Sequence, residues 1–180
     1  MPEQIPSFRY HPDPIATGSI VASDRECEVC HRSRGFVYQG PFFAVEAVES
    51  ICPWCIADGS AAAQFDGEFT DLHHIGWNNV PDETRDEVLR RTPGFAGWQQ
   101  ETWMAHCDDA AMFLGRAGSG DLRRLGPDAI DAIKSPLRDS RWSEEDLDRY
   151  IDALDAEGEP TAYVFRCRRC ASFLGYSDSG

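Results

Sequence analysis

Six of the seven cysteines in this 180-residue chain stand in Cys-x-x-Cys pairs, namely Cys27/Cys30, Cys52/Cys55 and Cys167/Cys170. Two cysteines at this spacing on a tight turn direct both sulfurs toward one point, and two such pairs complete a tetrahedral zinc site. Residues 31–51 separate the first two pairs, a spacing typical of zinc-binding modules. We therefore predict a structural zinc site with four protein ligands: Cys27, Cys30, Cys52 and Cys55.

Two other interpretations of these four cysteines stay open. The motif Cys52-Pro53-Trp54-Cys55 lies between an apolar segment and a predicted helix, which is also the setting of a thiol–disulfide oxidoreductase motif. The four residues are alternatively buried free thiols. The upstream pair, at metal-binding spacing, favours the zinc site over both.

The third pair predicts a second zinc site that needs two further ligands. Cys107 is the remaining cysteine and supplies the third ligand, so this site contains Cys107, Cys167 and Cys170. The fourth ligand is His106, an aspartate or water. Adjacent residues of an extended strand point to opposite faces, so His106 and Cys107 can share a metal only where the strand ends. The alternative is a packed hairpin with a buried thiol pair.

The fourth ligand decides whether the second site could be catalytic, because three protein ligands plus water is the catalytic zinc pattern. The chain contains no H-E-x-x-H motif, zinc-deaminase signature, phosphate-binding loop or G-x-S-x-G elbow. His73-His74 could also bind a metal, but an exposed loop pair is the favoured interpretation. We identify no catalytic residue and no organic cofactor, and a non-enzymatic role is favoured over an enzymatic one.

The elements around the first site follow the order of a treble-clef zinc finger. A knuckle at Cys27–Cys30 is followed by a predicted hairpin of residues 35–38 and 42–45, and then by a helix from the second cysteine pair through Phe65. Cys55 would lie in the first helical turn, where the helix N-terminus favours thiolate. We predict a treble-clef-like zinc module over residues 24–66.

The rest of the chain predicts an α+β fold. The Pro-rich residues 5–20 predict an extended arm that packs on the core through Phe8, Tyr10 and Ile20. The second half, residues 98–180, predicts a helical middle and a C-terminal β-hairpin that carries the zinc knuckle. Helices are predicted over 81–91, 110–116, 127–134 and after Ser143, and a strand over 98–106. We expect a single domain over residues 1–180, packed into one core.

Charge and hydropathy limit the partners. The chain has 31 acidic and 17 basic residues, so its net charge of −14 repels phosphates. We expect no direct nucleic-acid binding, and a basic protein partner. No apolar run reaches the ~20 residues that span a bilayer, and residues 1–10 do not show a signal-peptide pattern. We therefore expect a cytoplasmic location with reduced thiols and no membrane association, and leave the oligomeric state open.

Several long motifs resemble those of the CbrC family of bacterial proteins. They are residues 8–19 (FRYHPDPIATGS), 52–62 (CPWCIADGSAA), 91–95, 97–99, 103–107 and 165–170. The family takes its name from an association with colicin tolerance in enteric bacteria, and the resemblance implies no particular reaction. It implies a bacterial, cytosolic protein.

These observations favour a zinc-binding stress or regulatory protein that acts through protein–protein contacts. Zinc occupancy could itself be the signal, because the folding of small metal sites is coupled to the metal. A basic target such as the translation machinery suits the charge. The alternative is an enzyme, either a hydrolase at an open second zinc site or a Cys-x-x-Cys thiol–disulfide oxidoreductase.

Overall fold

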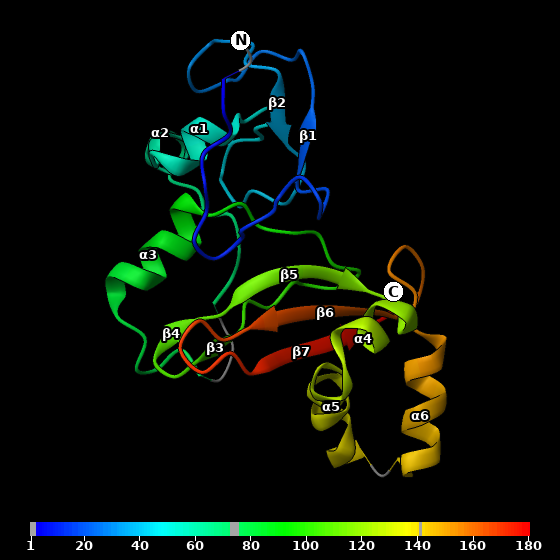
Figure 1. Cartoon of the computed structure of the whole chain (residues 1–180). Coiled ribbons are helices and arrows are strands. Elements are labelled where there is room, and N and C mark those ends of the chain that lie inside the picture. Colours follow the sequence, from blue (N-terminus) through cyan, green and yellow to red (C-terminus); the bar gives the residue numbers. More distant parts are fainter. Residues whose placement is uncertain (1–2, 73–75, 141) are drawn as a thin grey trace.

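The computed structural model describes residues 3–72, 76–140 and 142–180 as a mixed α+β fold (Figure 1), which confirms the predicted fold class. Its helices are short and its sheets small. The elements in chain order are β1 (Ile20–Ala22), β2 (Phe36–Tyr38), α1 (Pro53–Ala57), α2 (Ser60–Phe65), α3 (Asp82–Arg91), β3 (Ala105–His106), β4 (Asp109–Ala110), β5 (Met112–Ala117), α4 (Ser119–Leu125), α5 (Pro127–Lys134), the 3₁₀ helix η1 (Ser135–Ser140), α6 (Glu144–Ala153), β6 (Thr161–Arg166) and β7 (Phe173–Asp178).

A three-stranded antiparallel sheet with the order β5-β6-β7 forms the centre of the molecule. The C-terminal hairpin β6–β7 pairs in register from Thr161↔Asp178 to Arg166↔Phe173, as predicted. The predicted helix over residues 110–116 is wrong, because β5 occupies this segment. Its side chains alternate between buried and exposed from Phe113 to Ala117, and pairing with β6 overrides the helical preference of Ala, Met and Leu.

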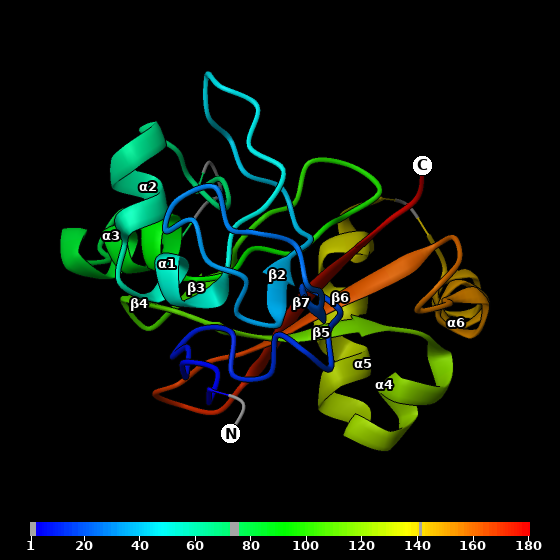
Figure 2. The same ribbon diagram turned by 90° about the horizontal axis from the view of Figure 1, so that it is seen from above.

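The helices α4, α5 and α6 lie together below and beside the sheet (Figures 1 and 2). The helix α5 packs so closely on β7 that a Cβ at Gly175 would lie 2.5 Å from Ile133 Cδ1. The predicted helix 127–134 is α5, and the predicted capping start at Ser143 is confirmed by a bond from the Asp146 amide to its hydroxyl. Together these helices and the sheet enclose one apolar cluster: Ala117, Leu122, Ala129, Ile133, Ile151, Leu154, Ala162 and Val164.

The N-terminal part stands on the opposite side of the sheet and contains the first two cysteine pairs (Figure 1). The predicted hairpin of residues 35–38 and 42–45 is wrong. The strand β2 pairs with β1 instead, and Phe43 forms a single bridge with Glu68. The helix predicted from the second cysteine pair does begin there, but it ends at Ala57, and α2 starts after Gly59, whose φ is +78°. The treble-clef order of elements is therefore present only in part.

The Pro-rich arm crosses from the N-terminal part to the sheet. Phe8, Tyr10 and Ile20 are all buried, as predicted, and the amide of Phe113 donates to the carbonyl of Tyr10 (2.8 Å). The arm thus contributes to two apolar clusters. One surrounds the first cysteine pairs and includes Phe8 and Ile20, and the other, around Trp103, includes Tyr10.

The predicted strand over residues 98–106 is present only as β3, its last two residues. The amides of Trp98 and Thr102 donate to the hydroxyls of Tyr163 (3.1 Å) and Tyr176 (3.0 Å), so side chains of the sheet take the place of a neighbouring strand. Among the described residues no helix has the length and apolar character needed to cross a membrane.

Acid is expected to destabilise the fold through His11, a fully buried residue of the arm. Its Nδ1 lies 2.7 Å from the Pro93 carbonyl and its Nε2 2.7 Å from Thr17 Oγ1, and burial lowers its pKa to about 4. Between this value and the unfolded pKa of ~6.5 only the unfolded chain binds the proton, so stability falls as the pH drops through this window, by roughly 3 kcal/mol in all.

Urea unfolding of the wild type and of His11→Gln at pH 7.5 and pH 4.5 measures this effect. Protonation of other groups affects both proteins alike, so the difference isolates His11. The variant should lose less stability on acidification, and an equal loss in the two proteins would contradict the assignment.

Candidate metal centres

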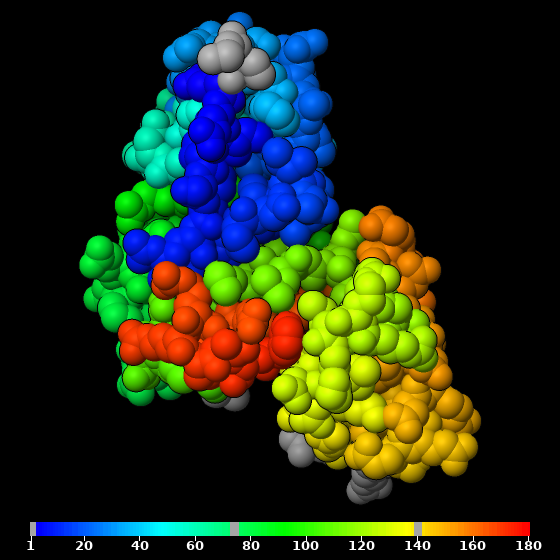
Figure 3. Space-filling view, viewed as in Figure 1, coloured from blue at the N-terminus to red at the C-terminus, as the bar shows by residue number. Residues whose placement is uncertain are grey.

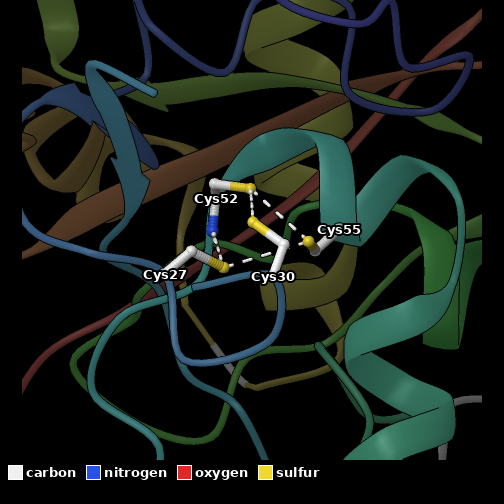
Figure 4. A group of neighbouring side chains, drawn as sticks. All are labelled: Cys27, Cys30, Cys52 and Cys55. Carbon is white, nitrogen blue, oxygen red and sulfur yellow. Dashed lines mark hydrogen bonds between the residues drawn. The ribbon is translucent and has the colours of Figure 1, made fainter. Parts of the chain in front are cut away.

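The structure brings Cys27, Cys30, Cys52 and Cys55 together, with all four sulfurs within 4.8 Å of one another (Figure 4). Sulfur–sulfur distances are 3.9 Å for Cys27–Cys55, 3.9 Å for Cys30–Cys52 and 3.5 Å for Cys52–Cys55. A tetrahedral zinc with Zn–S bonds of ~2.3 Å requires sulfurs about 3.8 Å apart. This first cysteine group therefore already has the spacing of a tetrahedral metal site.

Local backbone structure explains why the second pair points toward the first. Cys52 is the N-cap of α1, and Pro53 occupies the first helical position, where its missing amide proton costs no hydrogen bond. Cys55 follows one turn later in α1, so both sulfurs leave the helix N-terminus in the same direction. The amide of Cys52 also donates to the Cys27 sulfur (3.3 Å), which joins the two pairs directly.

The first and third pairs share one backbone turn. In the first, the amide of Cys27 donates to the carbonyl five residues later (3.1 Å), and the amide of His31 donates back to the Cys27 carbonyl (2.8 Å). The same two bonds begin at Cys167, at 2.9 and 3.0 Å. The residue four positions after the first cysteine, His31 or Ala171, has a φ of +53° or +61°. Two segments far apart in sequence thus form the same backbone turn around a Cys-x-x-Cys pair.

The surroundings lower the pKa of one thiol of the first group and raise the pKa of two others. The Cys52 thiol and several backbone amides donate to the Cys27 sulfur and lower the pKa of Cys27 to about 4. Donation to Cys27 raises the pKa of Cys52, and burial raises the pKa of Cys55 to about 11. Only Cys27 is thus favoured as a thiolate by the protein alone, whereas a divalent metal among the four sulfurs would stabilise all four as thiolates.

Arg34 supplies a further positive charge beside this group, a role that no sequence pattern indicated. Its guanidinium lies 3.9 Å from the Trp54 ring centroid, donates through Nε to Glu3 (2.9 Å), and interacts with the Cys52 sulfur. The Arg34 side chain is only 12% exposed. Arg34 is thus placed to offset the excess negative charge of four thiolates around a divalent ion.

The second predicted site also assembles. His106, Cys107, Cys167 and Cys170 place their ligand atoms within 4.8 Å of one another, and in the described part of the chain these two groups are the cysteine–histidine clusters of this kind. His106 Nδ1 lies 3.2 Å from the Cys107 sulfur and 3.4 Å from the Cys170 sulfur. About 3.6 Å separates N and S ligands in a tetrahedral zinc site. The other candidate pair, His73-His74, lies outside the described residues.

A tight turn allows neighbouring residues to share this second group. β3 ends at His106, and Cys107 and Asp108 form a two-residue turn into β4, both with a φ of +55°. Two consecutive positive φ values are the signature of a type I′ hairpin turn. The turn reverses the chain directly after His106, so the alternation of a continuous strand no longer separates the two side chains.

Three residues behind the second group connect it to the arm. Asp109 directly follows the turn and its side chain is 10% exposed; it accepts from Arg168 Nη1 (3.1 Å) and from the Tyr10 hydroxyl (2.8 Å). Arg168 belongs to the third cysteine pair and lies 5.3 Å from the Tyr10 ring centroid. The hairpin β3–β4, the C-terminal turn and the N-terminal arm therefore meet at one buried carboxylate. No sequence pattern indicates this contact.

The two groups differ in exposure and in thiol chemistry. Cys27, Cys52 and Cys55 are buried, whereas Cys107 and Cys170 are exposed and only Cys167 of the second group is buried. Figure 3 shows the orange-red segment of the third pair at the molecular surface. The Ser172 hydroxyl and amide lower the pKa of Cys170 to about 6, and donation to Cys170 raises the pKa of Cys107 to about 11.

Comparison with known proteins identifies close relatives. Residues 5–179 match the model of the "Uncharacterised protein family (UPF0167)". UPF0167 proteins of Mycobacterium bovis and Mycobacterium tuberculosis are each 49% identical over 178 residues, which cover 98% of this chain and 95% of theirs. A UPF0167 protein of Pseudomonas aeruginosa is 40% identical over 168 residues, 92% of either chain. No solved structure matches this chain significantly.

These matches correct the resemblance drawn from the motifs. The family model that covers the chain is UPF0167 and not the CbrC family, so the assignment to the CbrC family is wrong. On the extent and identity of the matches, the chain belongs to the UPF0167 family.

Proposed function

We propose that this chain holds two zinc ions and acts through contacts with other proteins rather than by catalysis. The observation that carries the proposal is the convergence of four protein ligand atoms in each of two groups. Thiolates combined with at most one imidazole favour zinc among the common divalent metals. Because His106 takes the fourth position of the second group, both sites are closed and structural.

A metal count tests this proposal. Protein purified without chelators should contain two zinc ions per chain by mass spectrometry of the elements, and Cys107→Ser should lower the count to about one. Because Cys107 belongs only to the second group, the ion that the variant retains is the one at the first group. Metal-free protein with all seven thiols titrating freely, or iron in place of zinc, would overturn the proposal.

The enzymatic alternatives have less support. A thiol–disulfide oxidoreductase exposes its attacking sulfur, whereas Cys52 and Cys55 are 0% and 3% exposed and lie beside the first pair. A zinc hydrolase needs an open coordination position, and His106 fills it in the second group.

The knuckle followed by a helix at the second pair supports a treble-clef-like module for the first site.

A basic protein segment is the partner that we propose, in a cytoplasm whose reducing conditions keep the thiols available for zinc. The net charge of −14 supports this partner. A cleft of about 450 Å³ between α5 and the start of β7 supports it as well, since Asp128 and Asp131 lie on one wall and Phe173 and Leu174 on the other. Figure 3 shows a notch between the red and yellow segments in this region.

A charge reversal at the cleft tests the partner proposal. A pull-down from zinc-replete and zinc-starved cells first identifies the partner, for example in the translation machinery. Asp128→Lys should then weaken binding about fivefold, the order of one surface charge pair, in a direct titration.

Glu83→Lys is the matched control for this variant. Glu83 and Asp128 both occupy the second position of a helix and are both exposed, so the loss of favourable helix-dipole interaction is similar. Asp131 is less suitable because it already pairs with Arg138 (2.7 Å). Equal affinity of the two variants would remove the cleft from the interface.

A further inference from the structure

The two cysteine groups differ in how easily a small oxidant can reach their sulfurs. The first group is enclosed: Cys27, Cys52 and Cys55 are buried, and Arg34 and Trp54 stack beside them. The second group presents the sulfurs of Cys107 and Cys170 at the surface. Both sulfurs belong to one cluster whose ligand atoms lie within 4.8 Å of one another.

We propose that Cys107 and Cys170 form a peroxide-oxidised pair, and that their oxidation to a disulfide releases the metal of the second group alone. The inference rests on the proposed metal at this group and goes beyond it by assigning a modification site. Hydrogen peroxide is the oxidant, a molecule small enough to approach a sulfur that is already at the surface.

The chemistry takes two electrons from two thiolates. The Cys170 thiolate attacks one peroxide oxygen, the O–O bond breaks, and hydroxide leaves, so Cys170 becomes a sulfenic acid. The Cys107 thiolate then attacks the Cys170 sulfur, an S–S bond forms, and a second hydroxide leaves. Two protons from solvent convert both hydroxides to water. The zinc ion is not reduced or oxidised; it loses two of its four ligands and leaves as the hydrated cation.

Local charge favours the first step at this group. Arg166, Arg168 and Arg169 surround the third cysteine pair in a chain that is otherwise strongly acidic. Arg168 is held beside the cluster by its ion pair with Asp109, and Arg166 by a bond from Nε to the Ala171 carbonyl (3.1 Å). These fixed guanidinium groups, on the segment that carries Cys170, favour the negative charge that develops on the departing hydroxide.

The fold tolerates the product. The metal joins two segments, the β3–β4 turn through Cys107 and the C-terminal turn through Cys167 and Cys170. A Cys107–Cys170 disulfide joins the same two segments. Both cysteines are exposed and their sulfurs lie within 4.8 Å of each other, so a shift of at most about 3 Å closes the ~2.05 Å bond. The contact of Asp109 with Arg168 and Tyr10 also links these segments independently of the metal. Oxidation is therefore confined to the centre and is reversible by a thiol reductant.

The test uses full-length protein loaded with two zinc ions and treated with hydrogen peroxide in the presence of a chromogenic zinc chelator. We expect release of one zinc ion per chain at least tenfold faster than the second, a Cys107–Cys170 disulfide in the peptide map, and recovery of the second ion after dithiothreitol and zinc. Loss of both ions at one rate, no release, or a Cys167–Cys170 disulfide in its place would overturn the inference.

A variant separates this inference from the proposal on which it rests. Cys107→His keeps four ligands of a type that binds zinc but removes one sulfur of the pair, so it should retain two zinc ions and release the second at least tenfold more slowly. A starting count below two zinc ions in the wild type contradicts the proposed function itself. A count of two with unchanged release in Cys107→His contradicts only the oxidation. If Cys107→His fails to hold its second zinc ion, the peptide map of the oxidised wild type still tests the inference, because it shows whether the disulfide joins Cys107 and Cys170.

Discussion

Replacing Cys52 by Ser is expected to abolish metal binding at the first cysteine group and to unfold the N-terminal part of the chain. Cys52 is a candidate ligand, the N-cap of α1 and a fully buried member of the apolar cluster that contains Phe8, Ile20 and Ile56. Metal-binding free energy at such sites is of the order of 10 kcal/mol and is largely folding free energy. That is comparable with the whole stability of a typical domain, about 5–15 kcal/mol.

Two-dimensional NMR of zinc-loaded protein measures the result. Resonances of residues in β1, β2 and α1 should collapse to unfolded positions in Cys52→Ser. The control is Cys107→Ser, which removes a ligand of the exposed second group and should leave those resonances dispersed. A Cys52→Ser protein that stays folded and retains two zinc ions would show that these sulfurs do not hold a structural metal.

Replacing Gly94 by Ala is expected to destabilise the protein by about 3 kcal/mol, or about 10 °C in melting temperature. A Cβ at Gly94 would lie 2.0 Å from the Phe69 carbonyl oxygen and 2.7 Å from the Tyr38 hydroxyl. The Phe69 amide donates a hydrogen bond to the Leu89 carbonyl (2.8 Å). Moving the Phe69 backbone away from the new Cβ would weaken this bond. Phe69 belongs to the cluster around the first cysteine group, and Phe95, next to Gly94, to the cluster around Trp103.

Calorimetry of Gly94→Ala and Gly120→Ala compares a crowded with an open glycine. The nearest atom to a Cβ at Gly120 is the flexible end of Arg124 at 4.0 Å, and Gly120 lies in α4, so this variant should gain roughly 0.5 kcal/mol. If residues 1–180 form a single domain, Gly94→Ala should lower one cooperative transition. A separate shift of one of two transitions would show that the N-terminal part unfolds independently.

The sequence indicated which cysteines the structure brings together far better than it indicated the sheets. Candidate ligand sets follow from residue type and short spacing. The pairs that begin at Cys27 and Cys52 could therefore be assigned to one group before any fold was known. The unpaired Cys107 was then the remaining cysteine that could complete a group with the pair that begins at Cys167. Helices with clear local signals were also predictable: Pro127 opens α5, Ser143 caps α6, and acidic and basic residues mark the two ends of α3.

What the sequence determined by itself is therefore the local chemistry: which side chains can bind a metal, where helices with strong capping or proline signals start, and how acidic the chain is. Tertiary structure alone decided which segments pair. Residues 42–45 are as apolar as a strand, yet β2 pairs with β1, and residues 110–116 favour a helix, yet β5 completes the sheet with β6. Only the fold placed Arg34 beside Cys52, and Asp109 between Arg168 and Tyr10. The physical reason is that a metal knuckle is specified within a few residues, whereas strand pairing and buried charge contacts depend on burial against segments far away in the chain.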